Sequence, residues 1–242
     1  EMCIRDRFPA TVEEARELVE KLLDKEIPLM AEKKVALVRE LSAMVARTPS
    51  GQVQAWPAVE SLQEDGICVE AVAPAPNSTP EILAAAEQLS RDVATELGVT
   101  GVLAVELFET TDENGQPEII VNELAMRPHN TGHWTQDGCV TSQFEQHLRA
   151  VLDRPLGSTE PTAPVVVMAN VLGAAEDPAM PMHERMDAVW RRFPNAKIHM
   201  YGKDWRPRRK IGHVNMLGED PARTREQARL AAKFLETAEW ED

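Results

Sequence analysis

The stretch GVLAVELFETTDENGQPEIIVNE, residues 101–123, decides the fold because it contains two strand patterns joined by a turn signal. Gly101–Glu109 is rich in branched and aromatic residues, and Glu118–Glu123 is a second strand candidate. Asn114-Gly115, which lies between them, is the strongest short-range signal for a two-residue hairpin turn. The stretch therefore predicts an antiparallel hairpin.

Counting outward from that turn along an unbulged ladder places Glu106 directly opposite Glu123. Two carboxylates on facing strands have Cβ atoms about 5 Å apart and repel each other, so we expect a cation between them. Mg²⁺ held by carboxylates and substrate phosphates fits. Strict alternation puts Asn122 on the other face, so it joins the site only at a bulge or a strand end. The alternative is a pair of solvated glutamates, and the apolar residues that share the face of Glu106 argue against it: Val102, Ala104 and Phe108.

Polar side chains crowd the next stretch, VNELAMRPHNTGHWTQDGC, residues 121–139. Fixed donors and ionisable groups so close together suit a site where a metal ion and an oxyanion lie side by side. Zinc is a second interpretation, since His129 and His133 are four residues apart. Pro128 and Gly132 disfavour the helix that would aim both imidazoles at one ion. The polar set is Asn122, Glu123, Arg127, His129, Asn130, Thr131, His133 and Thr135.

Length and composition describe an ordinary globular protein. The 242 residues can form one large domain or two, and 43% are hydrophobic and 27% charged. The formal charge of −14 argues against nucleic-acid or acidic-membrane partners. No apolar run approaches the roughly 18 residues of a membrane span, and nothing resembles a signal peptide. Three scattered cysteines without a CxxC motif favour a reducing cytoplasm.

The remaining chain alternates strand and helix patterns. A T-x-x-E capping box begins a helix at Thr11, Thr79-Pro80 begins another, and Asp220-Pro221 begins a closing helix. The other predicted helices are Thr141–Leu152 and Met186–Phe193, and the first predicted helix is Val12–Asp24. The other predicted strands are Pro28–Glu32, Val35–Arg47, Gln52–Val59, Ile67–Val72, Val165–Leu172, Lys197–Tyr201 and Ile211–Met216.

Asp153–Pro164 is the best candidate boundary because it holds three prolines and a glycine in twelve residues. We therefore expect residues 8–152 and 165–242 to form two domains joined by a 153–164 linker. Residues 1–7 have no clear pattern and are interpreted as a non-native or mis-joined leader.

A basic loop, KDWRPRRK at Lys203–Lys210, runs against the net charge with five cations in eight residues. It has three interpretations, namely a solvated loop tip, a nucleic-acid contact, or a pocket for a small phosphorylated substrate. The forked guanidinium groups of arginine match phosphate oxygens, which favours the pocket for a phosphorylated substrate. The proline in the loop lowers the entropy cost of ordering it around such a ligand.

Three blocks carry a resemblance to a known family: NELAMRPHNTGHWT at 122–135, TSQFEQHLRAVLDRPLG at 141–157, and YGKDWRPRRKIGHVN at 201–215. They resemble 5-(carboxyamino)imidazole ribonucleotide synthases, ATP-grasp ligases of purine biosynthesis, and the similarity runs from about Phe8 to the end. The resemblance implies an α+β ATP-grasp fold, an antiparallel sheet with packed helices, followed by a small C-terminal α/β domain. It implies ATP- and Mg²⁺-dependent carboxylation of aminoimidazole ribonucleotide with bicarbonate, through carboxyphosphate, by a cytoplasmic homodimer.

The resemblance also implies roles for single residues. Glu106, Glu123 and Asn122 match the Mg²⁺ ligands of the family. The residues that match its nucleotide site are Glu32, Lys33, Lys34, Val35, Glu40 and Gln63, together with Asn122 and Glu123. The residues that match its catalytic and substrate-binding groups are Arg127, His129, Asn130, Thr131, Lys203, Arg209 and Lys210.

The sequence departs from the family pattern in three places. Met126 and Thr131 replace the usual Pro and Ser, which are mild changes. The family's leading nucleotide-fold domain and Gly-rich loop are not found in these residues, so we expect the chain alone to be inactive or nearly so. Two alternatives stay open, another ATP-grasp carboxylase and an inactive nucleotide-binding fragment.

Overall fold

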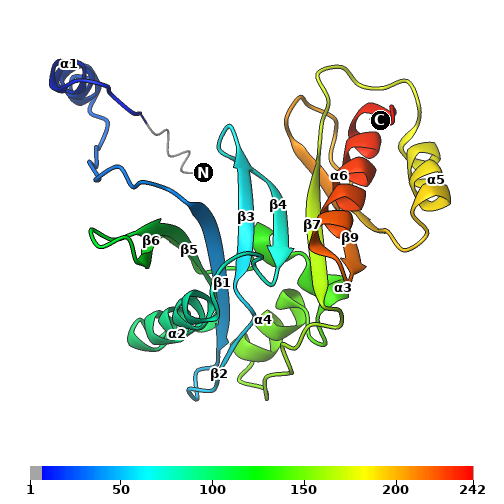
Figure 1. The fold of residues 1–242 in the computed structure, drawn as a ribbon, viewed down its shortest axis with the longest axis horizontal. Coiled ribbons are helices and arrows are strands. Elements are labelled where there is room, and N and C mark those ends of the chain that lie inside the picture. Colours follow the sequence, from blue (N-terminus) through cyan, green and yellow to red (C-terminus); the bar gives the residue numbers. More distant parts are fainter. Residues whose placement is uncertain (1–6, 242) are drawn as a thin grey trace. The chain divides into compact units, whose positions relative to one another are not determined.

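A computed structural model describes residues 7–241, and Figure 1 shows its helices and strands. The chain divides into two compact units, Glu1–Val35 and Ala36–Asp242, which are described separately. All but the last residue of the predicted 1–7 leader lies outside the described residues. Within residues 7–241, no helix is both long and apolar enough to cross a membrane.

The first unit contains helix α1, Val12–Leu23, as predicted. The hydroxyl of its N-cap Thr11 accepts a hydrogen bond from the Glu14 amide, and the Glu14 carboxylate accepts one from the Ala10 amide. The strand predicted at Pro28–Glu32 is wrong, because residues 28–35 contain neither helix nor strand. A short apolar pattern does not form a strand without a partner ladder.

The second unit is built on one antiparallel sheet, and the predicted antiparallel hairpin lies at its edge (Figure 1). The strand order is β6-β5-β1-β3-β4-β7-β9-β8, and β2 pairs with β1. The strands are β1 Arg39–Arg47, β2 Val53–Ala55, β3 Val59–Glu64, β4 Ile67–Ala73, β5 Gly101–Thr111, β6 Pro117–Ala125, β7 Val165–Leu172, β8 Lys197–Met200 and β9 Lys210–Gly218.

Helices cover both faces of this sheet, which confirms the predicted mixture of an antiparallel sheet and packed helices. On one face, α2 packs on a core around Leu41 and Val105, and α6 on a core around Val167 and Val214. We call the opposite face the site face; α3 and α4 lie beside its core. The helices are α2 Pro80–Glu96, α3 Thr135–Gly138, α4 Gln143–Val151, α5 Met182–Arg192 and α6 Pro221–Thr237, with a 3₁₀ turn η1 at Asn130–Gly132.

Capping signals located helix starts better than apolar patterns located strands. Thr79 and Asp220 are the N-caps of α2 and α6, as predicted. The strand predicted over Gln52–Val59 is confirmed only at Val53–Ala55, which is β2. Pro57, which has no amide hydrogen to donate, lies between β2 and the start of β3 at Val59. Helix α5 begins at Met182, directly after Pro181, rather than at Met186.

The segment 153–164 contains no helix or strand, apart from one isolated bridge between Cys139 and Pro161. The parts on its two sides share the sheet, because β4 pairs with β7 from Glu70↔Ala169 to Ala73↔Val166. The division into domains at this segment stays a prediction.

Candidate active site

The β5–β6 hairpin brings two carboxylates together. Glu106 lies directly opposite Glu123, which confirms the predicted pairing. The predicted two-residue turn is wrong, because the Asp112 amide donates to the Gln116 carbonyl at 2.8 Å around a three-residue loop. Gly115 ends that loop with φ +77°, a conformation that glycine adopts without strain.

A β-bulge compensates for the longer turn. The register shifts by one residue between Leu107↔Val121 and Glu106↔Glu123, so Asn122 is the extra residue of the bulge. In such a bulge, two residues of one strand oppose one residue of the other. We predicted that Asn122 could join the two glutamates only at a bulge or a strand end, and the backbone has a bulge at this residue.

The electrostatics of Glu106 favour a bound cation. Burial, followed by the carboxylates of Glu123 and Glu40, raises the pKa of Glu106 to about 7, while Lys210 and Arg127 oppose that shift. In residues 7–241, no three His, Cys, Asp or Glu side chains converge to hold a metal ion by themselves. Two carboxylates and an amide suit Mg²⁺, which takes its remaining ligands from phosphates and water. The residues present therefore fit Mg²⁺.

His129 contacts Glu106 and is part of a chain of polar contacts that also includes Thr131 and Ser42. Its Nε2 atom is 3.2 Å from Glu106 Oε1, and its Nδ1 atom is 2.9 Å from Thr131 Oγ1. Thr131 in turn donates to Ser42 Oγ at 2.8 Å, on the strand next to β5. Burial, then Arg127 and Lys210, lowers the pKa of His129 to about 4, so the imidazole is neutral near pH 7.

Two lysines bring positive charge to the same place. Lys210 begins β9, and its ammonium interacts electrostatically with Glu106, Cys68 and Lys203. The Lys203 ammonium lies 4.9 Å above the centre of the Tyr201 ring. Within the described residues, neither ammonium has a carboxylate oxygen within 4 Å. Two unneutralised ammonium groups are well suited to receive an anion.

A column of imidazoles connects these lysines to the loop that follows β6. The His133 ring stacks on His213 with centroids 4.7 Å apart, and His213 stacks on His199 at 4.6 Å. The Tyr201 hydroxyl lies 2.7 Å from His213 Nδ1. His129 and His133 therefore contact different neighbours, Glu106 and His213, rather than each other.

Glu40 and Gln63, predicted for the nucleotide site, also lie beside the carboxylates. Burial raises the pKa of Glu40, and a hydrogen bond from Gln63 opposes the rise. Gln63 donates a second hydrogen bond to Ser61 Oγ at 2.9 Å. The other predicted nucleotide residues, Glu32–Val35, belong to the first unit, so their part in the nucleotide site stays a prediction.

Three predicted site residues, Arg209, Arg127 and Asn130, have no described hydrogen bond or ion pair with Glu106 or Glu123. Arg209 donates to the Asp204 carbonyl at 3.2 Å within its own loop, and no described contact joins it to Glu106. Arg127 is exposed and donates to the Pro128 carbonyl at 3.2 Å. Asn130 adjoins Cys68: burial raises the pKa of Cys68, and a hydrogen bond with the Asn130 side chain is among the interactions that oppose the rise.

Two domain families match the chain. The sequence model of the ATP-grasp domain matches residues 7–144, and that of the phosphoribosylaminoimidazole carboxylase C-terminal domain matches residues 166–227. The first match covers more than half of the chain. The chain belongs to the ATP-grasp family.

Curated ATP-grasp relatives share most of the sequence. The chain is 57% identical over 235 residues to N5-carboxyaminoimidazole ribonucleotide synthase of Corynebacterium ammoniagenes. The aligned region covers 97% of the chain and 57% of that relative. The chain is 53% identical over 236 residues to the Mycobacterium tuberculosis enzyme of the same name, covering 98% of the chain and 54% of that relative. The chain thus spans just over half the length of these relatives.

Solved structures show the same ATP-grasp fold. N5-carboxyaminoimidazole ribonucleotide synthetase from Thermus thermophilus superposes with a TM-score of 0.79 at 37% identity, covering 96% of this chain and 59% of that one. The Aspergillus clavatus synthase, in complex with ADP and the aminoimidazole ribonucleotide, superposes with a TM-score of 0.77 at 33% identity, covering 92% and 58%. The α+β ATP-grasp fold predicted from the sequence is confirmed.

Sequence reasoning missed several buried or half-buried polar residues of this ATP-grasp site. His213 stood next to the basic loop, and its Gly-His setting was a usable signal. Gln143 had no such signal, because a glutamine near the start of a helix usually faces solvent. The missed residues are Ser42, Cys68, Gln143, His199, Tyr201 and His213.

Proposed function

We propose that the chain forms the catalytic part of an ATP- and Mg²⁺-dependent ligase. The reaction joins bicarbonate to the amine of 5-aminoimidazole ribonucleotide and yields 5-(carboxyamino)imidazole ribonucleotide, in purine biosynthesis. The observation that carries the proposal is Glu106 opposite Glu123, with His129 on Glu106 and Lys210 nearby. The names of the relatives in both comparisons support the choice of substrate.

The proposed chemistry has two steps. A bicarbonate oxygen attacks the γ-phosphorus of ATP, ADP leaves, and carboxyphosphate forms. The amine nitrogen of the ribonucleotide then attacks the carboxyl carbon of carboxyphosphate, and inorganic phosphate leaves. The protein contributes mainly positioning and charge stabilisation to both steps, because phosphoryl transfer needs little covalent help from side chains.

Glu106, Glu123 and Asn122 would hold Mg²⁺ on the site face. A bound Mg²⁺ ion supplies charge neutralisation at the ATP phosphates. The same two carboxylates set the geometry in which the phosphates are held. Glu40 and Gln63 would contact the nucleotide, with Glu40 on its ribose. The backbone of Glu32–Val35 would form the hinge that hydrogen-bonds the adenine.

Cationic side chains would stabilise the negative charge that develops during transfer. We assign Arg127 and Lys203 as electrostatic clamps, and Lys210 to the bicarbonate and ribonucleotide phosphate. His129 acts as a hydrogen bonder or a proton carrier beside Glu106, with Asn130 and Thr131 completing the corner. Arg209 is assigned to the ribonucleotide phosphate on resemblance alone, as is the homodimer. Location in the cytoplasm is supported by Cys68 and Cys139, which are free buried thiols.

The test follows inorganic phosphate released in the presence of ATP, Mg²⁺ and bicarbonate. Release that depends on aminoimidazole ribonucleotide supports the proposal. Release that depends on biotin instead would identify another ATP-grasp carboxylase. Binding of Mg²⁺ and ADP without any release would identify a nucleotide-binding fragment, and would contradict catalysis by this chain.

A further inference from the structure

Gln143, the first residue of α4, is fully buried against the loop that carries His129 and His133. Its Oε1 atom accepts the His129 amide hydrogen at 2.8 Å, and its Nε2 atom donates to the His129 carbonyl at 2.8 Å. The same Nε2 atom lies 3.1 Å from His133 Nδ1. A side-chain amide nitrogen has two hydrogens to donate, so both are engaged.

The backbone of Gln143 is itself fixed. Its amide donates to Thr135 Oγ1 at 2.8 Å, and Thr135 donates to the Gly132 carbonyl at 2.6 Å. A methyl group at Gly132 would lie 2.5 Å from Gln143 Oε1, so this turn fits closely around the amide. Gln143 therefore holds the loop from a position that the surrounding chain determines.

The two histidines held by Gln143 lead in different directions. His129 contacts Glu106 at the carboxylate end of the site. His133 stacks on His213, which is bonded to Tyr201 beneath the Lys203 ammonium at the cationic end. One buried amide thus joins the two ends through direct contacts.

We propose that Gln143 is a positioning residue that aims His129 at Glu106 and orients His133 within the imidazole column, so that both ends of the site are aligned at once. This inference rests on the proposed function for the identity of the reaction. Without the amide, the His129 backbone groups and His133 Nδ1 lose buried partners, and the loop has no other described hydrogen bond that reaches both histidines.

Gln146 on the same helix provides a matched control. It is also fully buried, and it clamps Gly157 in the same manner, with its Nε2 donating to the Gly157 carbonyl and its Oε1 accepting the Gly157 amide hydrogen, both at 2.8 Å. Gly157 lies in the 153–164 segment, and its side-chain neighbours are Thr141 and Arg149 rather than the histidines. Methionine is close to glutamine in length and is unbranched, so Gln143→Met and Gln146→Met remove equivalent clamps.

The experiment measures kcat, KM for ATP and melting temperature for both variants in a full-length version of the protein, together with the ¹⁵N signals of the histidine side chains. We expect kcat to fall about 10- to 100-fold in Gln143→Met, as for other residues that orient a metal-site group, with KM for ATP changed less than about threefold. Gln146→Met should lose a similar amount of melting temperature and keep kcat within about twofold. The His129 and His133 signals should move only in Gln143→Met.

Equal kcat losses in the two variants, or an unchanged kcat in Gln143→Met, would overturn the inference. If Gln143→Met does not fold, Gln143→Glu replaces it, because a carboxylate still accepts the His129 amide hydrogen but donates to neither other atom. Its kcat should fall below that of the wild type, and a wild-type kcat in Gln143→Glu also overturns the inference. A wild-type protein without ribonucleotide-dependent phosphate release would refute the proposed function alone, since the histidine signals still decide the role of Gln143.

Discussion

Charge is unevenly distributed among the residues of the site. The carboxylates of Glu40, Glu106 and Glu123 repel one another, and burial adds to the cost of ionising Glu106. Such a cost is tolerated where a ligand removes it, and a divalent cation removes it most directly. Burial lowers the pKa of His129 and of His133 to about 4, so near pH 7 the positive charge beside them comes from lysine and arginine side chains rather than from these two imidazoles.

Glu123→Gln should separate metal binding from other uses of β6. The change removes one negative charge from the carboxylate pair but keeps the shape of the side chain. We expect Mg²⁺-dependent turnover, measured in a full-length version of the protein, to fall on the order of 100-fold, with little change in melting temperature. Glu118→Gln is the control, because Glu118 is exposed on the same strand, opposite Thr110. Similar activity in both variants would remove Glu123 from the metal site.

Acid should destabilise the protein through His213 and His133. Burial lowers the pKa of His133 to about 4 and that of His213 to about 3, both from 6.5. The unfolded chain then binds protons that the folded chain excludes, so the free energy of unfolding falls as pH falls from about 6.5 toward 4. Each histidine contributes up to about 1.4 kcal/mol per pH unit. The raised pKa of Glu106 acts in the opposite direction across part of this window.

Comparing how steeply the unfolding free energy depends on pH in two histidine variants isolates the contribution of His213. His213→Phe keeps a stacking ring and removes the titrating group, so its urea unfolding free energy should depend less steeply on pH than that of the wild type. His183→Phe, at an exposed position on α5, should keep the wild-type slope. Parallel slopes for wild type and His213→Phe would show that the column does not exclude protons.

At the scale of elements, the hairpin shows what could be derived from sequence. Counting outward from Asn114-Gly115 correctly paired Glu106 with Glu123, although the turn is one residue longer than that count assumed. The bulge at Asn122 cancels that extra residue. The chemistry of the turn residues cannot reveal this bulge, because a bulge is set by how the two strands pair farther along the hairpin.

Contacts between distant elements were beyond sequence reasoning. The basic loop was recognised from its charge, but its attachment to the site through Tyr201 and His213 depends on β8 and β9 lying side by side. Gln143 was likewise hidden, since its partners lie ten and fourteen residues away across two turns. Pattern analysis found the charged groups, and packing determined which of them meet.

Tyr201→Phe tests whether this loop is held for substrate binding. The change removes the hydroxyl that bonds His213 but leaves the ring under Lys203. One hydrogen bond contributes about 0.5–1.5 kcal/mol, so KM for the ribonucleotide should rise about threefold to tenfold with kcat within about twofold. Trp205→Phe in the same loop is the control, because the Trp205 indole nitrogen has no hydrogen-bond partner in residues 7–241. Equal KM values in the two variants would contradict the proposal for Tyr201.

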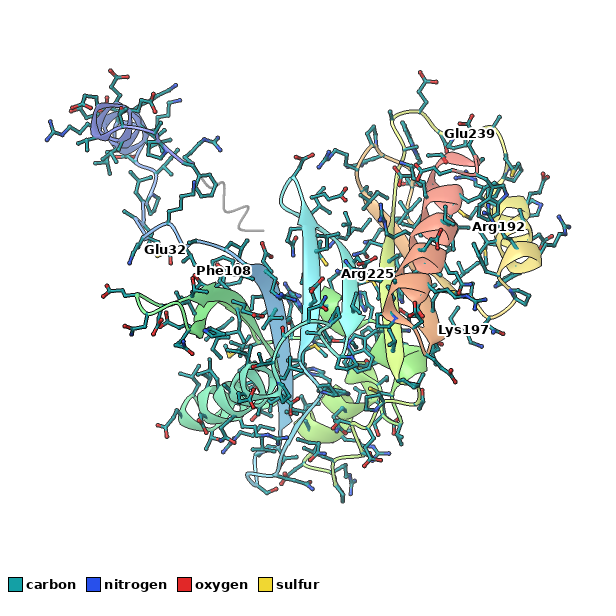
Figure 2. All side chains as sticks on the ribbon, viewed as in Figure 1. Glu32, Phe108, Arg192, Lys197, Arg225 and Glu239 are labelled. Carbon is teal, nitrogen blue, oxygen red and sulfur yellow. The ribbon has the colours of Figure 1, made fainter. Side chains whose placement is uncertain are left out.

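At the scale of the whole second unit, an ion network joins the two halves of the sheet on the face opposite the site. Arg39 on β1 pairs with Glu109 at 3.2 Å and with Glu60 at 3.3 Å. Arg225 of α6, labelled in Figure 2, pairs with the same Glu60 at 3.2 Å and with Glu70 at 2.6 Å. Strands on one side of the 153–164 segment are thus tied to a helix on the other.

Arg225→Met should therefore destabilise the second unit as a whole. Glu70 is only 1% exposed, and burial already raises its pKa despite Arg225, so removing the guanidinium leaves a buried carboxylate without its partner. We expect a loss of about 3 kcal/mol in the free energy of unfolding, measured by urea denaturation at pH 7. Arg223→Met, at an exposed position two residues earlier in α6, should change it by less than about 0.5 kcal/mol. Adding Glu70→Gln to Arg225→Met should restore part of the loss, because the unpaired charge is then absent. A double variant no more stable than Arg225→Met alone would show that the charge of Glu70 is not what links the halves.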